Sequence, residues 1–142
     1  MNLYLDTEFN TFHGPLISMA IVPEDGLPFY EVLHLPNRID PWVAQNVVPQ
    51  LGKDPIRGVT FQSKLWQWML PYNESDIYAD WPEDIAHLAN WLCAPNGKQL
   101  DIQLRFHLIK SGKLCPAVPH NALSDAIALK EWHLNDQGSG TG

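Results

Sequence analysis

The first third of the chain alternates apolar and polar positions in short runs that turn residues separate. Three such runs have the length and pattern of β-strands, at residues 3–9, 16–22 and 29–35. Gly14-Pro15 and the segment PEDGLP (23–28) between them carry the Gly, Pro and Asp that turns favour. Because short turns join antiparallel neighbours, the pattern predicts an antiparallel three-stranded meander.

The rest of the chain has apolar residues at the spacing of helices, separated by two further strand candidates. Asp40-Pro41 predicts a helix start, with Asp40 as N-cap, and an irregular loop follows at 49–59. Apolar spacing predicts three more helices, at 60–70, 82–92 and 120–134. Short apolar segments predict strands at 75–79, parallel to the first strand, and at 99–104. The order predicts an α/β fold: a mixed five-stranded sheet, antiparallel in its first three strands, with helices on both faces.

Size and composition fit one globular domain. The chain has 142 residues, of which 45% are apolar, and we expect a domain at 1–135 and a flexible, Gly-rich tail at 136–142. No apolar run reaches the roughly 20 residues of a membrane span. The first residues carry neither a basic region nor a long apolar region, so we expect no secretory signal. Cys93 and Cys115 lie far apart without a CxxC pattern, which argues against a zinc site and favours a reducing, cytoplasmic location.

The charge balance restricts how the chain can bind a polyanion. The formal net charge is -7, so a nucleic-acid partner needs a local basic patch or bound cations. Six of the nine basic residues fall in or near expected loops. They form either a track for backbone phosphates or scattered solvated charges, and the sequence leaves both readings open: Lys53, Arg57, Lys64, Arg105, Lys110 and Lys113.

Carboxylates gather where the predicted strands end. Asp6 and Glu8 are two apart in the first strand, so they point to the same face and repel each other unless a cation lies between them. Asp80 follows the strand at 75–79, and Asp84 lies in the first turn of the next helix. Since the carboxyl ends of parallel strands meet at one edge of a sheet, we expect these acids to share a site.

The segment PHNALSDA (119–126) adds a histidine and another acid. Asn121 is a candidate helix cap, Asp125 lies in the first turns of that helix, and His120 precedes it. Carboxylate oxygens suit Mg²⁺ or Mn²⁺ rather than zinc, and two such ions can activate a phosphate for hydrolysis. A histidine beside them has the chemistry of a general base for the attacking water.

These motifs, in this order, resemble the DEDDh 3′–5′ exonucleases. The matching residues are Asp6-x-Glu8, Asp84 at a helix start, and His120 with Asp125 in the HNALSDA run. The family is ribonuclease H-like and includes proofreading exonuclease domains, ribonuclease T and oligoribonuclease. The small size and the HNALSDA segment are most similar to the compact bacterial and phage exoribonucleases of this family. The resemblance implies a ribonuclease H-like fold and hydrolysis of single-stranded nucleic acid, RNA favoured, to nucleoside monophosphates. Several relatives are homodimers, which makes a homodimer an expectation here too.

The resemblance also implies roles for individual residues. Two Mg²⁺ or Mn²⁺ ions would be held by four carboxylates, those of Asp6, Glu8, Asp84 and Asp125. His120 would be the general base, and Glu8 would also lie near the terminal nucleotide, which Phe9 and Asn10 are placed to touch.

The middle motif departs from the family pattern. The family usually has Asn, three residues and then Asp, often with an aromatic residue before that Asp. Here Asp80 stands in the place of the Asn, and Glu83 precedes Asp84. We therefore take Asp84 as the ligand, with Asp80 as the alternative ligand or as a group that supports one.

Each motif alone has an ordinary structural explanation. A D-x-E pair can end a solvated strand, and HNAxxD can start a helix through its Asn cap and favourable Asp. Two other functions stay open: a catalytically silent nucleic-acid-binding module on the same fold, and an endonuclease of the ribonuclease H type. The tryptophans are either core residues or include a base-stacking platform: Trp42, Trp66, Trp68 and Trp81.

Overall fold

The computed structural model describes the backbone of residues 1–139 and the side chains of residues 1–136. Five strands form one sheet: β1 (Asn2–Phe9), β2 (Leu16–Pro23), β3 (Phe29–Val32), β4 (Ser75–Ala79) and β5 (Leu104–Leu108). Four α-helices accompany it: α1 (Pro41–Asn46), α2 (Gly58–Met69), α3 (Pro82–Trp91) and α4 (Ala122–Ser139). Short 3₁₀ turns follow α1 and α2, η1 at Val48–Gln50 and η2 at Leu70–Tyr72. Over residues 1–139, no helix combines the length and apolar character that crossing a membrane requires.

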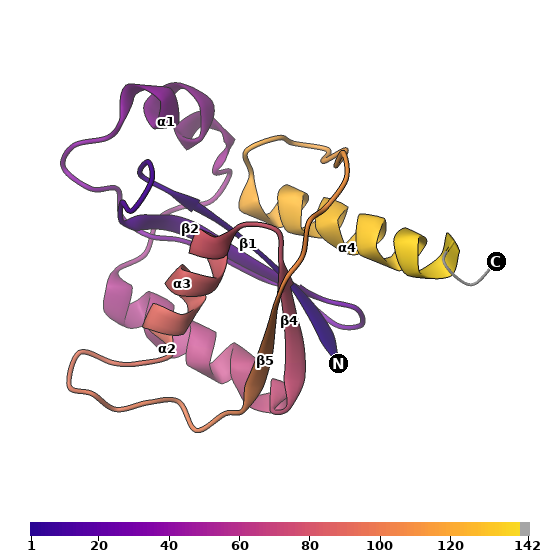
Figure 1. The fold of residues 1–142 in the computed structure, drawn as a ribbon. Helices are drawn as coiled ribbons and strands as arrows, with labels where there is room; N and C mark the ends of the chain where they lie inside the picture. Colours follow the sequence, from indigo (N-terminus) through magenta and orange to yellow (C-terminus); the bar gives the residue numbers. More distant parts are fainter. Residues whose placement is uncertain (140–142) are drawn as a thin grey trace.

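The sheet is mixed, with strand order β3-β2-β1-β4-β5 (Figure 1). β1 pairs antiparallel with β2, and β2 pairs antiparallel with β3. β4 lies parallel to β1, with Leu3 opposite Ile77, and β5 lies parallel to β4. The predicted meander, the parallel fourth strand and the mixed five-stranded α/β sheet are therefore confirmed.

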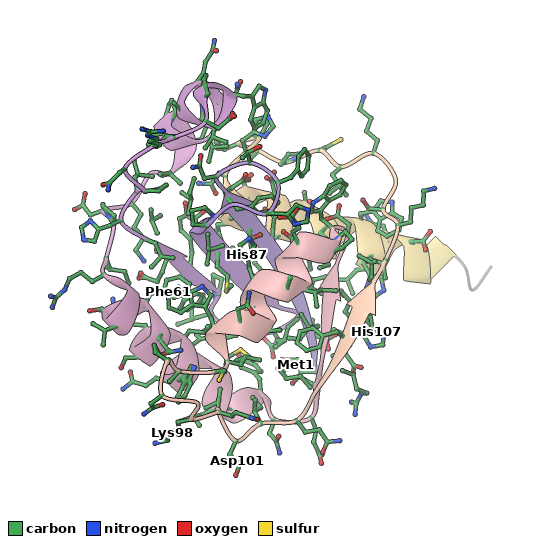
Figure 2. The ribbon with its side chains drawn as sticks, turned by 60° about the vertical axis from the view of Figure 1, so that its left-hand side comes forward. Met1, Phe61, His87, Lys98, Asp101 and His107 are labelled. Atoms are coloured by element: carbon green, nitrogen blue, oxygen red, sulfur yellow. The ribbon has the colours of Figure 1, made fainter. Side chains whose placement is uncertain are left out.

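Helices cover both faces of the sheet because β1 is apolar on both of its sides. Leu3 and Leu5 point to the face that α2 and α3 cover, where they join a core that includes Phe61 and Leu88. Figure 2 shows Phe61 of α2 directed toward the strands. Tyr4 points to the opposite face, where the buried Ala122, Ala126 and Leu129 of α4 pack. The central strand is thus fixed from both sides, which makes its carboxyl end a rigid platform.

The fifth strand differs from the prediction. It runs over Leu104–Leu108, whereas the sequence predicted 99–104. Residues 100–103 instead bond to neighbouring loops: Leu100 N donates to Leu92 O, and Gln103 N donates to Asn73 Oδ1. The observed strand is an edge strand whose Arg105 and His107 side chains bind Asp76 on β4, so partners on β4 decide its register.

Other helix and strand boundaries also differ from the predicted ones. β3 ends at Val32 rather than at residue 35, because Leu33 already bridges to Ile56 in the following loop. α2 starts at Gly58, within the predicted 49–59 loop. α4 begins at Ala122 and continues to Ser139, so the predicted tail boundary at residue 136 falls inside this helix. The last part of that predicted tail, 140–142, lies outside the described residues.

Candidate functional site

The candidate site forms where β1 and β4 end together. The parallel pairing of these strands brings Glu8, near the end of β1, and Asp80, just after β4, to one edge of the sheet. α3 starts two residues beyond Asp80 and carries Asp84 in its first turn, while α4 carries Asp125 in its first turn. Four separate elements thus each supply acids to one place.

Five carboxylates form two groups that share Asp6. In the first group, Asp6, Glu8 and Asp125 each offer an oxygen, and these oxygens lie within 4.8 Å of one another. In the second group, Asp6, Asp80 and Asp84 do the same within the same limit. The predicted ligands therefore come together, and both Asp84 and the alternative Asp80 lie at the site.

Two of these acids have oxygens that bond to nothing in the described chain. Asp6 Oδ2 and Asp84 Oδ2 are buried without a hydrogen-bond partner there. The other oxygen of Asp84 is fixed, because the Thr7 hydroxyl donates to Oδ1 at 2.6 Å and the Thr7 backbone N–H donates at 3.2 Å. Asp80 is different: its Oδ2 accepts from the Ser111 hydroxyl at 2.9 Å.

Unpartnered buried carboxylate oxygens are costly, and a hard dication is the group that would satisfy them. All the candidate metal-binding atoms are carboxylate oxygens, and Asp6 belongs to both carboxylate groups. These residues fit one or two Mg²⁺ or Mn²⁺ ions, with Asp6 available to both positions.

Burial raises the pKa of these carboxyls above their ordinary values. The pKa of Glu8 rises to about 9, that of Asp84 to about 7 and that of Asp125 to about 6, while that of Asp6 rises strongly. Loss of hydration is the largest cause for each, and neighbouring negative charges add to it, such as Asp84 beside Asp6 and Asp125 beside Glu8. Without cations, the site favours protonated acids.

We therefore expect the metal-free protein to lose stability as pH rises from about 5 to about 9. The folded state, with raised pKa values, binds more protons than the unfolded chain, whose carboxyls titrate near their ordinary values of about 4. Stability is present at low pH and is lost as pH passes through the raised pKa values. In EDTA, the Tm should fall by about 10 °C over this range. Scanning fluorimetry measures it, with saturating Mn²⁺ expected to cancel most of the fall; a Tm in EDTA that stays constant or rises contradicts the expectation.

His120 lies at the rim of the same site. It is exposed, its backbone adopts a positive φ of 66°, and its ring lines a cleft of about 780 Å³ together with Asp6, Glu8 and Asp84. Its ring makes a T-shaped contact with Trp42 of α1, with ring centroids 5.1 Å apart and planes at 84°. The predicted base therefore lines the same cleft as the carboxylates and comes from the loop that precedes α4.

Asn121 fixes the loop that carries His120. Its Oδ1 accepts from Ser124 N at 3.0 Å, which confirms the predicted cap of α4. Its Nδ2 donates to Gln50 O at 2.8 Å and to the Tyr30 hydroxyl at 3.3 Å. These bonds tie the start of α4 to the η1 segment and to β3.

Of the two predicted substrate contacts, Phe9 lines the cleft and Asn10 is not among its lining residues. Phe9 packs against the His87 ring, with centroids 5.1 Å apart. The Asn10 side chain forms hydrogen bonds with backbone atoms of the segment before α1: Nδ2 donates to Arg38 O at 2.8 Å, and Oδ1 accepts from Asp40 N at 2.8 Å. In this structure Asn10 holds the chain that leads into α1.

The four tryptophans named above divide between the cleft and the core, and no Lys or Arg is among the described residues that line the cleft. Trp42 and Trp81 line the cleft, whereas Trp66 and Trp68 pack against the core and bond to backbone carbonyls. Of the six basic residues named for a phosphate track, three contact acids outside the cleft: Lys53 and Lys64 contact Glu31, and Arg105 contacts Asp76.

Sequence reasoning missed Thr7, Ser111 and Phe12. Thr7 lies between the two acids of the first motif and points to the other face of β1, where it meets Asp84; that alternation was the signal available. Ser111 and Phe12 lie in loops, where no periodicity predicts direction. A comparison of the sequence with protein-family models and with curated proteins gives no match.

Proposed function

We propose that this protein is a metal-dependent 3′–5′ exonuclease that hydrolyses single-stranded nucleic acid, with RNA favoured. The observation that carries the proposal is the pair of carboxylate groups that share Asp6, with His120 in the same cleft. The order of the strands and the position of the acids at the ends of β1 and β4 support a ribonuclease H-like fold.

The chain's own residues have clear roles in this chemistry. Asp6, Glu8, Asp84 and Asp125 would hold the ions, whose charge, when they are bound, stabilises the negative charge that develops on the scissile phosphate. His120 would accept a proton from the attacking water. Its loop position and its contact with Trp42 leave the imidazole exposed to the cleft.

The reaction breaks one bond and forms one. Oxygen of water bonds to the phosphorus of the last phosphodiester, and the bond from phosphorus to the 3′ oxygen of the preceding nucleotide breaks. The terminal nucleotide leaves as a 5′-monophosphate. The 3′ oxygen of the shortened strand takes up one proton from solvent, which balances the proton that His120 receives and later releases, so the strand ends in a free 3′ hydroxyl.

The direct test is digestion of 5′-labelled RNA and DNA strands with Mg²⁺, Mn²⁺ or EDTA. We expect a ladder of 3′-shortened products with either ion and none in EDTA. A strand with a blocked 3′ end and a circular strand should both resist. Cleavage of the circle would point to an endonuclease, and metal-independent binding without cleavage would point to a silent binding module.

A further inference from the structure

His120 adopts a backbone conformation that residues other than glycine rarely take. Its φ is 66°, in the left-handed region of backbone space. Its side chain is exposed, so burial in the core does not hold the residue there. Such a conformation persists only where surrounding contacts fix it. The contacts of the loop that carries His120 therefore determine where the candidate general base lies.

Two contacts of this loop reach one neighbouring segment, residues 41–51, which contains α1 and η1. The Asn121 side chain donates from Nδ2 to Gln50 O at 2.8 Å. The His120 ring contacts Trp42 of α1, with ring centroids 5.1 Å apart. Because both contacts fall on the same segment, the attachment of that segment to the sheet also sets the position of the His120 loop.

Tyr30 of β3 joins that segment to the start of α4 through its hydroxyl. The hydroxyl donates to Leu51 O at 2.6 Å, because a backbone carbonyl can only accept. The hydroxyl oxygen accepts from Asn121 Nδ2 at 3.3 Å. The two Nδ2 protons of Asn121 are then both used, one on Tyr30 and one on Gln50 O. The Asn121 Oδ1 accepts from Ser124 N, so the whole amide has partners and its orientation is fixed.

Tyr30 is itself held in the same sheet as the acids. It pairs with Ala20 of β2, which pairs in turn with Asp6 of β1. Residues directly opposite each other in neighbouring strands point to one face, so the Tyr30 ring lies in the row of Asp6. Lys53 donates to Tyr30 O at 2.7 Å and to the Glu31 carboxylate at 2.6 Å, which holds the chain after η1 against β3. The Tyr30 hydroxyl thus links the His120 loop to the strands that carry the carboxylates.

We propose that Tyr30 is a positioning residue for His120: its hydroxyl holds segment 41–51 and the Asn121 side chain together, and so keeps the imidazole in the cleft. This inference rests on the proposed exonuclease function, in which His120 accepts a proton from the attacking water. Without the hydroxyl, Asn121 Nδ2 loses one of its two acceptors and Leu51 O loses its donor. A displaced base accepts the proton less efficiently, although substrate and metal still bind.

The first test is Tyr30→Phe, assayed with Mn²⁺ on a 5′-labelled oligoadenylate, in the ribo or deoxy form that is cleaved faster. We expect kcat to fall about 10- to 50-fold, while KM and the Mn²⁺ affinity from calorimetry change less than about twofold. Tyr72→Phe is the matched control, because it removes a hydroxyl of the same kind from η2, outside the cleft. It should leave all three values unchanged. An unchanged kcat in Tyr30→Phe, or a loss of Mn²⁺ affinity, would overturn the inference.

A double-mutant cycle with His120→Ala separates positioning from a general effect on the fold. His120→Ala alone should lower kcat by about 100-fold or more. Tyr30→Phe added to His120→Ala should lower kcat by no more than about twofold further, because the group that Tyr30 positions is absent. A purely structural role would lower kcat by the same factor in both backgrounds, and that result would refute the positioning role.

The NMR signals of the His120 ring give a readout without turnover, and their loss in His120→Ala assigns them. The Trp42 ring, 5.1 Å away, shifts these signals, and Trp42→Leu gives their unshifted position. We expect Tyr30→Phe to move the His120 signals toward that unshifted position and Tyr72→Phe to leave them in place. Signals that stay in place in a folded Tyr30→Phe protein would show that the hydroxyl does not hold the ring.

The two proposals can fail separately. If the protein cleaves no strand with any ion, but Tyr30→Phe still moves the His120 signals, the exonuclease function is wrong and the placement of His120 by Tyr30 stands. If it cleaves strands from the 3′ end, but Tyr30→Phe acts equally with and without His120, the function stands and the positioning role is wrong.

Discussion

Asp6→Asn is expected to lower kcat/KM for metal-dependent cleavage at least about 1000-fold. Asp6 belongs to both carboxylate groups, and its Oδ2 has no hydrogen-bond partner among the described residues. An amide of the same size keeps the packing but removes the negative charge at the one position that both groups use. Loss of a shared ligand weakens both groups at once, so the effect should exceed that of any other single acid.

The same substitution should stabilise the metal-free protein. Burial is the largest cause of the raised pKa of Asp6, and the four neighbouring acids, Asp84, Glu8, Asp125 and Asp80, raise it further, so the ionised form is both poorly hydrated and repelled by its neighbours. In EDTA at about pH 8, we expect Asp6→Asn to raise the Tm by about 3–8 °C while abolishing the Tm increase that Mn²⁺ gives to the unsubstituted protein. A loss of activity together with a gain of metal-free stability separates a ligand from a structural residue.

Asp101→Asn is the matched control, because it makes the same chemical change on the loop between α3 and β5, where Figure 2 labels the residue. Asp101 is exposed and lies outside the cleft, so activity and Tm should both stay as in the unsubstituted protein. Full activity in Asp6→Asn would refute the metal assignment. Equal shifts in the two variants would show that general charge, and not the site, sets the stability.

The features that the sequence predicted well depend on local patterns. β1, β2 and β4 are short apolar runs next to turn residues, which is the local pattern of buried strands. The side-by-side placement of Asp6 and Glu8 follows from strand period, and the cap of α4 follows from Asn121. Neighbouring residues in the sequence determine these strands, the shared face of Asp6 and Glu8, and the helix cap. These features could therefore be predicted from the sequence alone.

The features that the sequence missed depend on partners far along the chain. β5 takes its register from Asp76 on β4, and the apolar pattern of its own residues is too weak to mark it. The contact between Thr7 and Asp84 spans 77 positions, and the contact between Asn121 and Gln50 spans 71. Such tertiary bonds leave no periodicity, which explains why the acids were predictable and the groups that hold them were not.

The two candidate acids of the middle motif, Asp84 and Asp80, are expected to differ in their importance for turnover. We expect Asp84→Asn to lower kcat/KM by about 100-fold or more, and Asp80→Asn to lower it by less than about tenfold. Asp84 is 1% exposed, Thr7 fixes one of its oxygens, and the other oxygen is buried and unpartnered within the described chain. Asp80 is less buried, and its Oδ2 already accepts from Ser111, so an amide there loses less.

Steady-state digestion of a short oligonucleotide with Mn²⁺ compares the two amide variants, which have the same size and the same change of charge. Calorimetric titration of Mn²⁺ gives a second readout: Asp84→Asn should weaken binding or remove a site, whereas Asp80→Asn should leave the number of sites unchanged. If only Asp80→Asn abolished turnover, Asp80 would be the ligand, and the bonds between Thr7 and Asp84 would be structural. One oxygen of Asp80 and one of Asp84 lie within 4.8 Å of an Asp6 oxygen, so distance from Asp6 does not separate the two acids. Any difference between the two variants would therefore come from the hydrogen bonding and burial of the two carboxylates.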